Sequence, residues 1–198
     1  MQRVIFLDRD GTINEEVNYL HRPEDLKLLD GVAEAVRLWK DHGYRLVVVT
    51  NQAGVARGYY TEADVEKLHN CLNQVLREQG GGEIDRFYYC PHHPEHGVGA
   101  YKKQCHCRKP ETGMFEMAEQ DEPVDKAHSW MIGDKLIDIR AGQKYGVKTV
   151  LVGTGYGTAV HQEQVRKGEQ PYDIFAQTLV DAARIIVAGG GDSAGEEV

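Results

Sequence analysis

The stretch Val4-Ile5-Phe6-Leu7-Asp8-Arg9-Asp10-Gly11-Thr12 indicates both the fold and the place of a site. Four apolar residues predict a buried strand, and two carboxylates, Asp8 and Asp10, follow directly before a Gly-Thr turn. In open α/β sheets, ligands bind beyond the carboxyl ends of the strands. Side chains two residues apart in an extended chain point to the same side, so both carboxylates can face one pocket. Taken alone, Asp-x-Asp-Gly also fits a turn that begins the next element.

Apolar runs and amphipathic stretches alternate along the rest of the chain. We expect strands at residues 3–7, 45–50, 86–90, 129–133, 148–152 and 172–175. Helices are expected at 31–42, from an N-cap at Thr61 to the glycines at 80–82, and at 113–120, 134–145 and 178–187. This alternation predicts an α/β fold, a Rossmann-like parallel sheet with helices on both faces. We expect one domain over 1–188 and a disordered, Gly-rich acidic tail at 189–198.

The composition limits the classes of function. The 198 residues carry a formal charge of −8, so the chain lacks the basic surface that nucleic-acid binding requires. No apolar run is long enough to span a membrane, and the N-terminus has no signal-peptide pattern, so we expect a cytoplasmic protein. The absence of a heptad repeat favours a monomer.

Four short motifs carry reactive side chains, and three of them lie at strand ends. They are Asp8-Arg9-Asp10, Thr50-Asn51-Gln52, Arg108-Lys109-Pro110, and Gly133-Asp134-Lys135 with Asp138 one helical turn later. Each motif alone is common in turns and on helix surfaces. Their order favours a shared site, because the carboxyl ends of parallel strands meet at one edge of the sheet.

These residue types suit phosphate-ester hydrolysis, in which positioning and charge supply almost all of the catalysis. We predict that Asp8 attacks phosphorus and forms an aspartyl-phosphate, while Asp10 protonates the leaving oxygen and then activates water. The Thr50 hydroxyl and the Lys109 ammonium are expected to hold the phosphoryl oxygens. A divalent cation has to offset the charge repulsion, and Asp8 with Asp134 offers the oxygen ligands that Mg²⁺ prefers.

The series Asp-x-Asp-Gly-Thr, Thr-Asn, Arg-Lys-Pro and Gly-Asp-x-x-x-Asp resembles the haloacid dehalogenase superfamily of aspartate-nucleophile phosphatases, over nearly the whole chain. The resemblance implies the fold of that superfamily. No large cap domain is expected, because little chain separates Thr12 from Arg45. The resemblance also implies that Asp10 is the acid and base of a phosphatase, and that its backbone carbonyl is a further magnesium ligand.

A segment rich in Cys and His precedes Lys109. Cys90 and His92 form a Cys-x-His pair, and Cys105 and Cys107 form a Cys-x-Cys pair. Three thiolates and one imidazole fit a closed, structural Zn²⁺ site, which would make residues 90–107 a zinc-bound loop that anchors the cations after it. The alternative is that the cysteines only pack. His92 mirrors the Cys-x-Cys spacing, and the other candidates for the fourth ligand are His93, His96 and His106.

The Cys and His pairs narrow the resemblance to two phosphatase families, one acting on the 7-phosphate of heptose 1,7-bisphosphates and one acting on histidinol phosphate. Gly113-Met114 and Lys135 look like the heptose family. This implies a small sugar bisphosphate as substrate and heptose 1-phosphate as product, which feeds nucleotide-activated heptose for lipopolysaccharide or other glycans. The preferred anomer depends on the shape of the pocket, which the sequence does not specify.

The same resemblance implies a set of substrate-binding residues around the motifs. They are Glu16, Val17, Asn18, Tyr19, Asn51, Gln52, Ala53, Arg108 and Lys135. Ala53 stands where a Ser is expected, which removes a hydroxyl contact but no catalytic group. Two alternative classes are a nucleic-acid 3′-phosphatase of the same superfamily, for which the basic groove is lacking, and a non-catalytic zinc-containing binding module.

Overall fold

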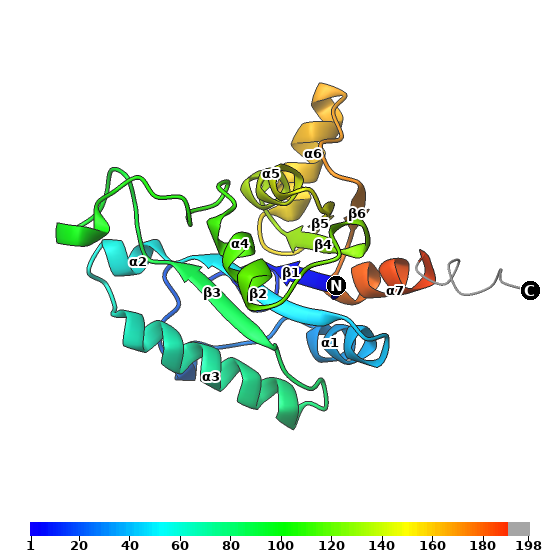
Figure 1. Ribbon diagram of the computed structural model, residues 1–198, viewed down its shortest axis with the longest axis horizontal. Helices are drawn as coiled ribbons and strands as arrows, with labels where there is room; N and C mark the ends of the chain where they lie inside the picture. Colours follow the sequence, from blue (N-terminus) through cyan, green and yellow to red (C-terminus); the bar gives the residue numbers. More distant parts are fainter. Residues whose placement is uncertain (190–198) are drawn as a thin grey trace, which may run out of the picture.

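The computed structural model describes residues 1–189, within which six strands form one parallel sheet. The strands are β1 (Val4–Leu7), β2 (Arg45–Asn51), β3 (Arg86–Cys90), β4 (Trp130–Gly133), β5 (Lys148–Val152) and β6 (Ile174–Ala176). Their order is β3-β2-β1-β4-β5-β6, and every pairing is parallel. β1 lies in the middle of the sheet (Figure 1), and all four of its side chains are buried.

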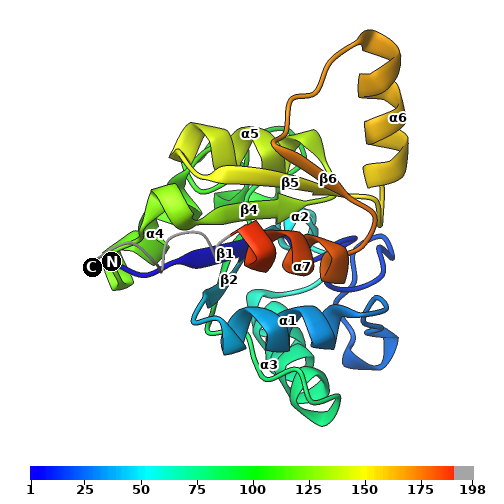
Figure 2. The ribbon, with the colours of Figure 1, turned by 90° about the vertical axis from the view of Figure 1, so that its right-hand side faces the viewer.

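Helices cover both faces of the sheet. They are α1 (Val32–Asp41), α2 (Ala53–Ala56), α3 (Glu62–Glu78), α4 (Gly113–Asp121), α5 (Leu136–Tyr145), α6 (Gly157–Lys167) and α7 (Leu179–Gly189), with the 3-10 turns η1 (Pro23–Asp25), η2 (Gly99–Tyr101) and η3 (Lys126–His128). One core joins the sheet to α1, α3 and α7, and the other joins it to α4 and α5 (Figure 2). Ile5 and Leu7 face the first core, and Val4 and Phe6 face the second. The predicted fold class is confirmed.

Local signals account for several element boundaries. The Thr61 hydroxyl accepts a hydrogen bond from the Asp64 amide at 3.2 Å, and the Asp64 carboxylate accepts one from the Thr61 amide at 2.8 Å, as the expected N-cap requires. β6 begins at Ile174, two residues later than expected. α6 was not expected, because only Gly157 and Gln164 are buried on it and it has no apolar stripe. This helix projects from the sheet in both ribbon views (Figures 1 and 2).

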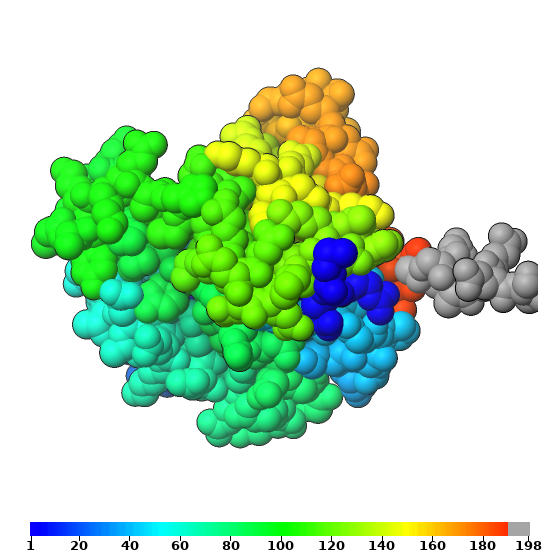
Figure 3. Space-filling view, in the orientation of Figure 1, coloured from blue at the N-terminus to red at the C-terminus, as the bar shows by residue number. Residues whose placement is uncertain are grey.

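The strand order determines where a ligand can bind. The chain winds outward in opposite directions from β1 and β4, and open α/β sheets bind ligands at the carboxyl ends of strands beside such a switch. Between β1 and β2 lie only η1 and α1, so no large cap is inserted there. The loop between β3 and α4, residues 91–112, contains η2 and forms a lobe at one end of the molecule, drawn green in Figure 3. Among residues 1–189, no helix is long and apolar enough to cross a membrane. The predicted tail lies outside the described residues from residue 190 onward.

Candidate active site

A cavity of about 260 Å³ lies at the carboxyl ends of β1, β2 and β4, where the four motifs meet. Asp8 follows β1, Thr50 and Asn51 end β2, and Lys109 reaches in from the loop before α4. The lining residues are Asp8, Asp10, Glu16, Asn18, Tyr19, Thr50, Asn51, Gln52, Ala53, Tyr60, Arg108, Lys109, Lys135, Ile137 and Asp138.

A buried ion-pair cluster joins Lys109 to two carboxylates. Its Nζ lies 2.8 Å from Asp8 Oδ1 and 2.6 Å from Asp138 Oδ1, and its side chain is 1% exposed. Burial acts to lower the pKa of Lys109, but the charges of Asp138 and Asp8 outweigh it, so the pKa is raised and the ammonium remains charged. The motifs alone do not predict a role for Asp138. In the structure it is the second carboxylate that holds Lys109 beside Asp8.

Asp134 presents a buried oxygen that lacks a donor. Its Oδ2 accepts a hydrogen bond from the Tyr156 amide at 2.9 Å, whereas Oδ1 has no hydrogen-bond partner within residues 1–189 and lies 3.6 Å from the Lys135 ammonium. Burial is the main cause that raises the pKa of Asp134 to about 7; the Lys135 charge opposes the shift, and the Asp8 and Asp138 charges add to it. A Cβ at Gly11 would lie 2.4 Å from Asp134 Oδ2, so only glycine fits against this carboxylate.

The three acidic side chains form a set that suits a divalent cation. Oxygens of Asp8, Asp134 and Asp138 lie within 4.8 Å of one another. Carboxylates held this close repel each other unless protons or a cation compensate them. An all-oxygen set is typical of Mg²⁺. The residues present therefore fit magnesium.

Asp10 is held by four hydrogen bonds. Oδ1 accepts from Arg9 Nε at 3.1 Å and from Asn14 Nδ2 at 3.0 Å. Oδ2 accepts from Arg9 Nη2 at 3.0 Å and from Gln52 Nε2 at 3.1 Å. Burial acts to raise the pKa of Asp10, but the Arg9 charge and these hydrogen bonds outweigh it, so the pKa is lowered. The carboxylate is thus fixed in one orientation at the cavity wall.

Three consecutive residues at the end of β2 contact different parts of the site. Asn51 donates from Nδ2 to the Lys109 carbonyl at 3.1 Å and accepts from the Lys109 amide at 3.0 Å, so it clamps the backbone of that residue. Gln52 Nε2 donates to the Thr50 hydroxyl at 2.9 Å as well as to Asp10. The Tyr60 hydroxyl, which no motif identified, donates to Gln52 Oε1 at 2.7 Å.

Residues predicted to bind substrate form much of the mouth of the cavity. Lys135 Nζ lies 2.9 Å from Glu16 Oε2 and 4.8 Å from the centre of the Tyr156 ring. Arg108 donates to the His92 carbonyl at 3.1 Å. Val17 is the exception: it does not line this cavity, and its side chain is 40% exposed in a neighbouring depression of the same loop.

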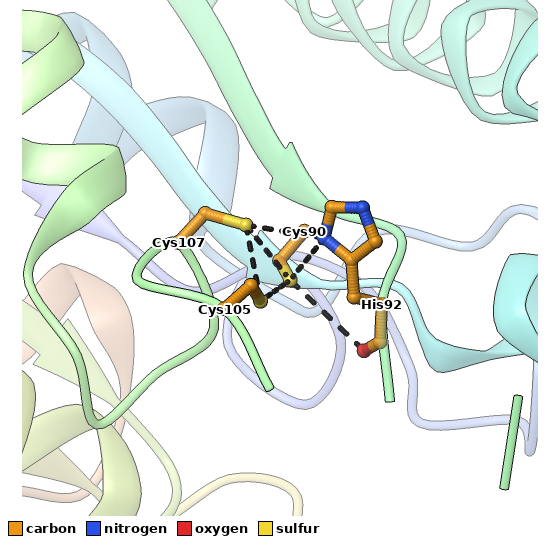
Figure 4. Close-up of side chains that lie close together, drawn as sticks. All are labelled: Cys90, His92, Cys105 and Cys107. Atoms are coloured by element: carbon orange, nitrogen blue, oxygen red, sulfur yellow. Dashed lines mark hydrogen bonds between the residues drawn. The ribbon is translucent and has the colours of Figure 1, made fainter. Parts of the chain in front are cut away.

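The cysteine and histidine pairs converge in space (Figure 4). The Sγ atoms of Cys90, Cys105 and Cys107 lie 3.2–3.4 Å apart. His92 Nδ1 lies 3.4 Å from the sulfur of Cys107 and 3.7 Å from that of Cys90. Zinc–sulfur bonds of about 2.3 Å give a tetrahedron with edges of about 3.8 Å, so small outward shifts of the sulfurs would accommodate the ion.

Ionisation within this cluster also suits a metal. The side-chain hydrogen bond between Cys107 and Cys90 is the main cause that lowers the pKa of Cys107, and the thiolate is the form that binds metals. The alternative histidines lie elsewhere: His93 Nδ1 accepts from the backbone amides of two following residues, and His106 Nε2 lies 2.9 Å from the Glu116 carboxylate. Within the described chain, His92 is therefore the imidazole that completes the set.

Comparison with known proteins gives the same assignment as the motifs. The family model described as HAD-hydrolase-like matches residues 106–182. The chain is 44% identical over 181 residues to a D-glycero-beta-D-manno-heptose-1,7-bisphosphate 7-phosphatase of Haemophilus ducreyi, covering 91% of this chain and 96% of that protein. It is 42% identical over 158 residues to a D-glycero-alpha-D-manno-heptose-1,7-bisphosphate 7-phosphatase of Photorhabdus laumondii, covering 79% of this chain and 86% of the relative.

The fold has a matching relative among solved structures. The D,D-heptose 1,7-bisphosphate phosphatase of B. bronchiseptica, solved with magnesium and phosphate, superimposes with a TM-score of 0.81 at 29% identity. The match covers 95% of this chain and 99% of that one. With this degree of identity over nearly its whole length, the chain belongs to the heptose 1,7-bisphosphate 7-phosphatase family of haloacid dehalogenase-like hydrolases.

Proposed function

We propose that this protein removes the 7-phosphate of a D-glycero-D-manno-heptose 1,7-bisphosphate and releases heptose 1-phosphate and inorganic phosphate. The observation that carries the proposal is the buried Lys109 ammonium between Asp8 and Asp138 at the base of the cavity. This arrangement supports a nucleophilic carboxylate with a fixed cation beside it. Membership of the heptose-bisphosphate family supports the choice of substrate.

The proposed chemistry has two steps on the same carboxylate. In the first, an oxygen of Asp8 attacks phosphorus and the bond to the sugar oxygen breaks. Asp10, which has to take up a proton from solvent beforehand because its pKa is lowered in the substrate-free site, donates that proton to the sugar oxygen. In the second, Asp10 accepts a proton from water, the water oxygen attacks phosphorus, and the bond to Asp8 breaks. Lys109 and the Thr50 hydroxyl stabilise the charge on the phosphoryl oxygens in both steps.

Magnesium is the cofactor that the acidic set fits. We propose that Asp8, Asp134 and the backbone carbonyl of Asp10 hold it, with Asp134 Oδ1, which accepts no hydrogen bond within the described residues, as one of the ligand atoms. When bound, the ion supplies positive charge that offsets the repulsion between the carboxylate and the phosphate. Asp138 then acts through Lys109, whose position it fixes.

Recognition of the remainder of the substrate falls to the mouth of the cavity. A bisphosphate carries about four negative charges near neutral pH, which Arg108 and Lys135 can pair. Glu16 already holds Lys135 in place, and Asn18, Tyr19 and Ala53 complete the wall around the sugar. We also propose that Zn²⁺ on Cys90, His92, Cys105 and Cys107 anchors the loop that carries Arg108 and Lys109.

Phosphorus NMR of the reaction tests the proposal directly. The two phosphates of each heptose 1,7-bisphosphate anomer are followed separately in the presence of magnesium, with histidinol phosphate as the competing substrate. We expect selective loss of the 7-phosphate, and the faster substrate identifies the anomer. Asp8→Asn should lower the rate at least about a thousandfold, whereas Asp41→Asn, at an exposed carboxylate ending α1, should not change it. Preference for histidinol phosphate, or an active Asp8→Asn protein, would refute the assignment.

A further inference from the structure

The residue between the two motif carboxylates is a fully buried arginine. Arg9 is 0% exposed, although it carries a full charge in the middle of the site. A buried guanidinium is costly unless each of its N–H groups finds a partner. Nε and Nη2 form the bidentate pair with Asp10, and Nη2 also donates to the Leu20 carbonyl and to Gln52 Oε1, both at 3.2 Å. Arg9 does not line the cavity, so it serves Asp10 from behind.

The remaining nitrogen of Arg9 faces a histidine on a distant element. Nη1 lies 3.4 Å from Nε2 of His69, a residue of α3 that is 4% exposed. A guanidinium can only donate, so Nε2 of His69 accepts and its proton lies on Nδ1. Burial and, next, the Arg9 charge lower the pKa of His69 to about 3. The imidazole is therefore neutral, and able to accept a hydrogen bond, across the pH range in which enzymes normally work.

The orientation of His69 is itself fixed by packing. Its ring stacks on Phe87 of β3, with centroids 4.4 Å apart and planes 15° apart. His69 does not line the cavity and cannot touch a substrate there. His69 therefore connects β3 to the site: its ring packs on Phe87 and its Nε2 contacts Arg9. Arg9 in turn holds the Asp10 carboxylate at the cavity wall.

We infer that His69 is a positioning residue: it fixes the plane of the Arg9 guanidinium, and Arg9 in turn aims the Asp10 carboxyl at the oxygen that leaves the substrate. The inference rests on the proposed role of Asp10 as general acid. Without the acceptor on His69, Nη1 has to find another partner, and the fork that orients Asp10 rotates with it. Attack by Asp8 and charge stabilisation by Lys109 do not depend on this contact.

Dependence on the leaving group separates this role from a general structural one. An alkoxide leaves poorly and needs the proton from Asp10, whereas 4-nitrophenolate leaves without it. Removing a general acid lowers the rate about 10²–10⁴-fold, and mispositioning it should lower the rate by a smaller factor. Asp10 also activates water in the second step, which both substrates share, so the comparison uses the rate of leaving-group release in the first turnover. For His69→Leu we expect that rate to fall about tenfold or more on heptose 1,7-bisphosphate and less than about threefold on 4-nitrophenyl phosphate.

Two variants control this measurement. Gln places an acceptor at the position of Nε2, so His69→Gln should restore most of the activity on the sugar substrate. His161→Leu makes the same substitution at another histidine, which stacks on Phe175 at 3.7 Å and bonds to the Tyr172 hydroxyl away from the cavity. It should leave the ratio of the two rates unchanged. If His69→Leu does not fold, His69→Met, which is longer and lacks a strong acceptor, takes its place.

The outcomes distinguish this inference from the proposed function. Asp10→Asn is measured on the same substrates, and a loss of first-turnover rate confined to the poor leaving group confirms Asp10 as the acid. If Asp10→Asn shows that pattern but the His69 variant loses both activities equally, or if Gln restores nothing, the inference is wrong. If Asp10→Asn itself slows leaving-group release in the first turnover equally for both substrates, the proposed role of Asp10 as general acid fails instead.

Discussion

Replacing Asp134 with Asn should stabilise the magnesium-free protein while it removes the magnesium-dependent activity. Asp134 is 0% exposed, and its Oδ1 has no hydrogen-bond partner within the described chain. Burial is the main cause that raises its pKa from 3.8 to about 7. Above that pH the folded protein contains a charge that its surroundings disfavour. An amide in the same place carries no charge and can keep the hydrogen bond from the Tyr156 amide.

The sign and size follow from the two pKa values. Because the folded pKa is the higher one, the folded state binds more protons than the unfolded state between pH 3.8 and about 7, and stability decreases as the pH rises through that range. Three pKa units correspond to about 4 kcal/mol. At pH 8, we therefore expect the unfolding free energy of Asp134→Asn to exceed that of the native protein by up to about 4 kcal/mol, and by roughly 2 kcal/mol at pH 5.

Urea denaturation of both proteins at pH 5 and pH 8, with and without magnesium, measures the difference. Comparison at one pH cancels other titrating groups such as His69, whose lowered pKa makes stability fall as the pH drops below 6.5. At a hundred times its dissociation constant, magnesium should stabilise the native protein by about 2.7 kcal/mol and Asp134→Asn hardly at all. Asp125→Asn, at a carboxylate whose pKa is lowered by His128, is the control and should not stabilise. The reasoning is refuted if Asp134→Asn is no more stable than the native protein at pH 8.

Three other substitutions test how the site is held. Asn51→Leu removes both hydrogen bonds to the Lys109 backbone and should lower kcat about tenfold in steady-state phosphate release, whereas unchanged turnover would show that the clamp is dispensable. Cys105→Ser should lose zinc, measured by atomic emission, and lower kcat at least about tenfold by misplacing Lys109. Full activity in zinc-free protein would contradict this coupling. Lys135→Met removes a cation proposed to pair with the second phosphate. The KM for the bisphosphate should therefore rise more than that for 4-nitrophenyl phosphate, and an equal change would exclude a contact to the second phosphate.

The sequence was sufficient to predict those parts of the site whose positions follow from the ends of the parallel strands. Asp8, Thr50 and Asp134 each sit at or just after the end of a parallel strand, so their meeting at one edge follows once the strands are recognised. Neighbours that arrive from distant elements carry no such signal. His69 is an ordinary histidine in an amphipathic helix until α3 packs against β3, and Tyr60 lies in a connection between two helices.

The structure differs from the prediction where the local sequence patterns are weak. α6 was not predicted because most of its residues are exposed, so its sequence lacks the apolar periodicity of an amphipathic helix. The loop after β1 was expected to present Glu16, Val17, Asn18 and Tyr19 to the substrate together. Its path turns Val17 away from the cavity, and a chain without regular structure gives no periodicity from which that could be read.

The end of β2 has a consequence for how this protein can change in evolution. Thr50 and Gln52 face the reacting groups, whereas Asn51 between them holds the backbone of Lys109. A single-residue insertion or deletion within β2 would exchange these directions all at once, because side chains alternate along a strand. Point substitutions alter one contact at a time. The spacing from Arg45 to Gln52 therefore has to remain constant for the site to survive.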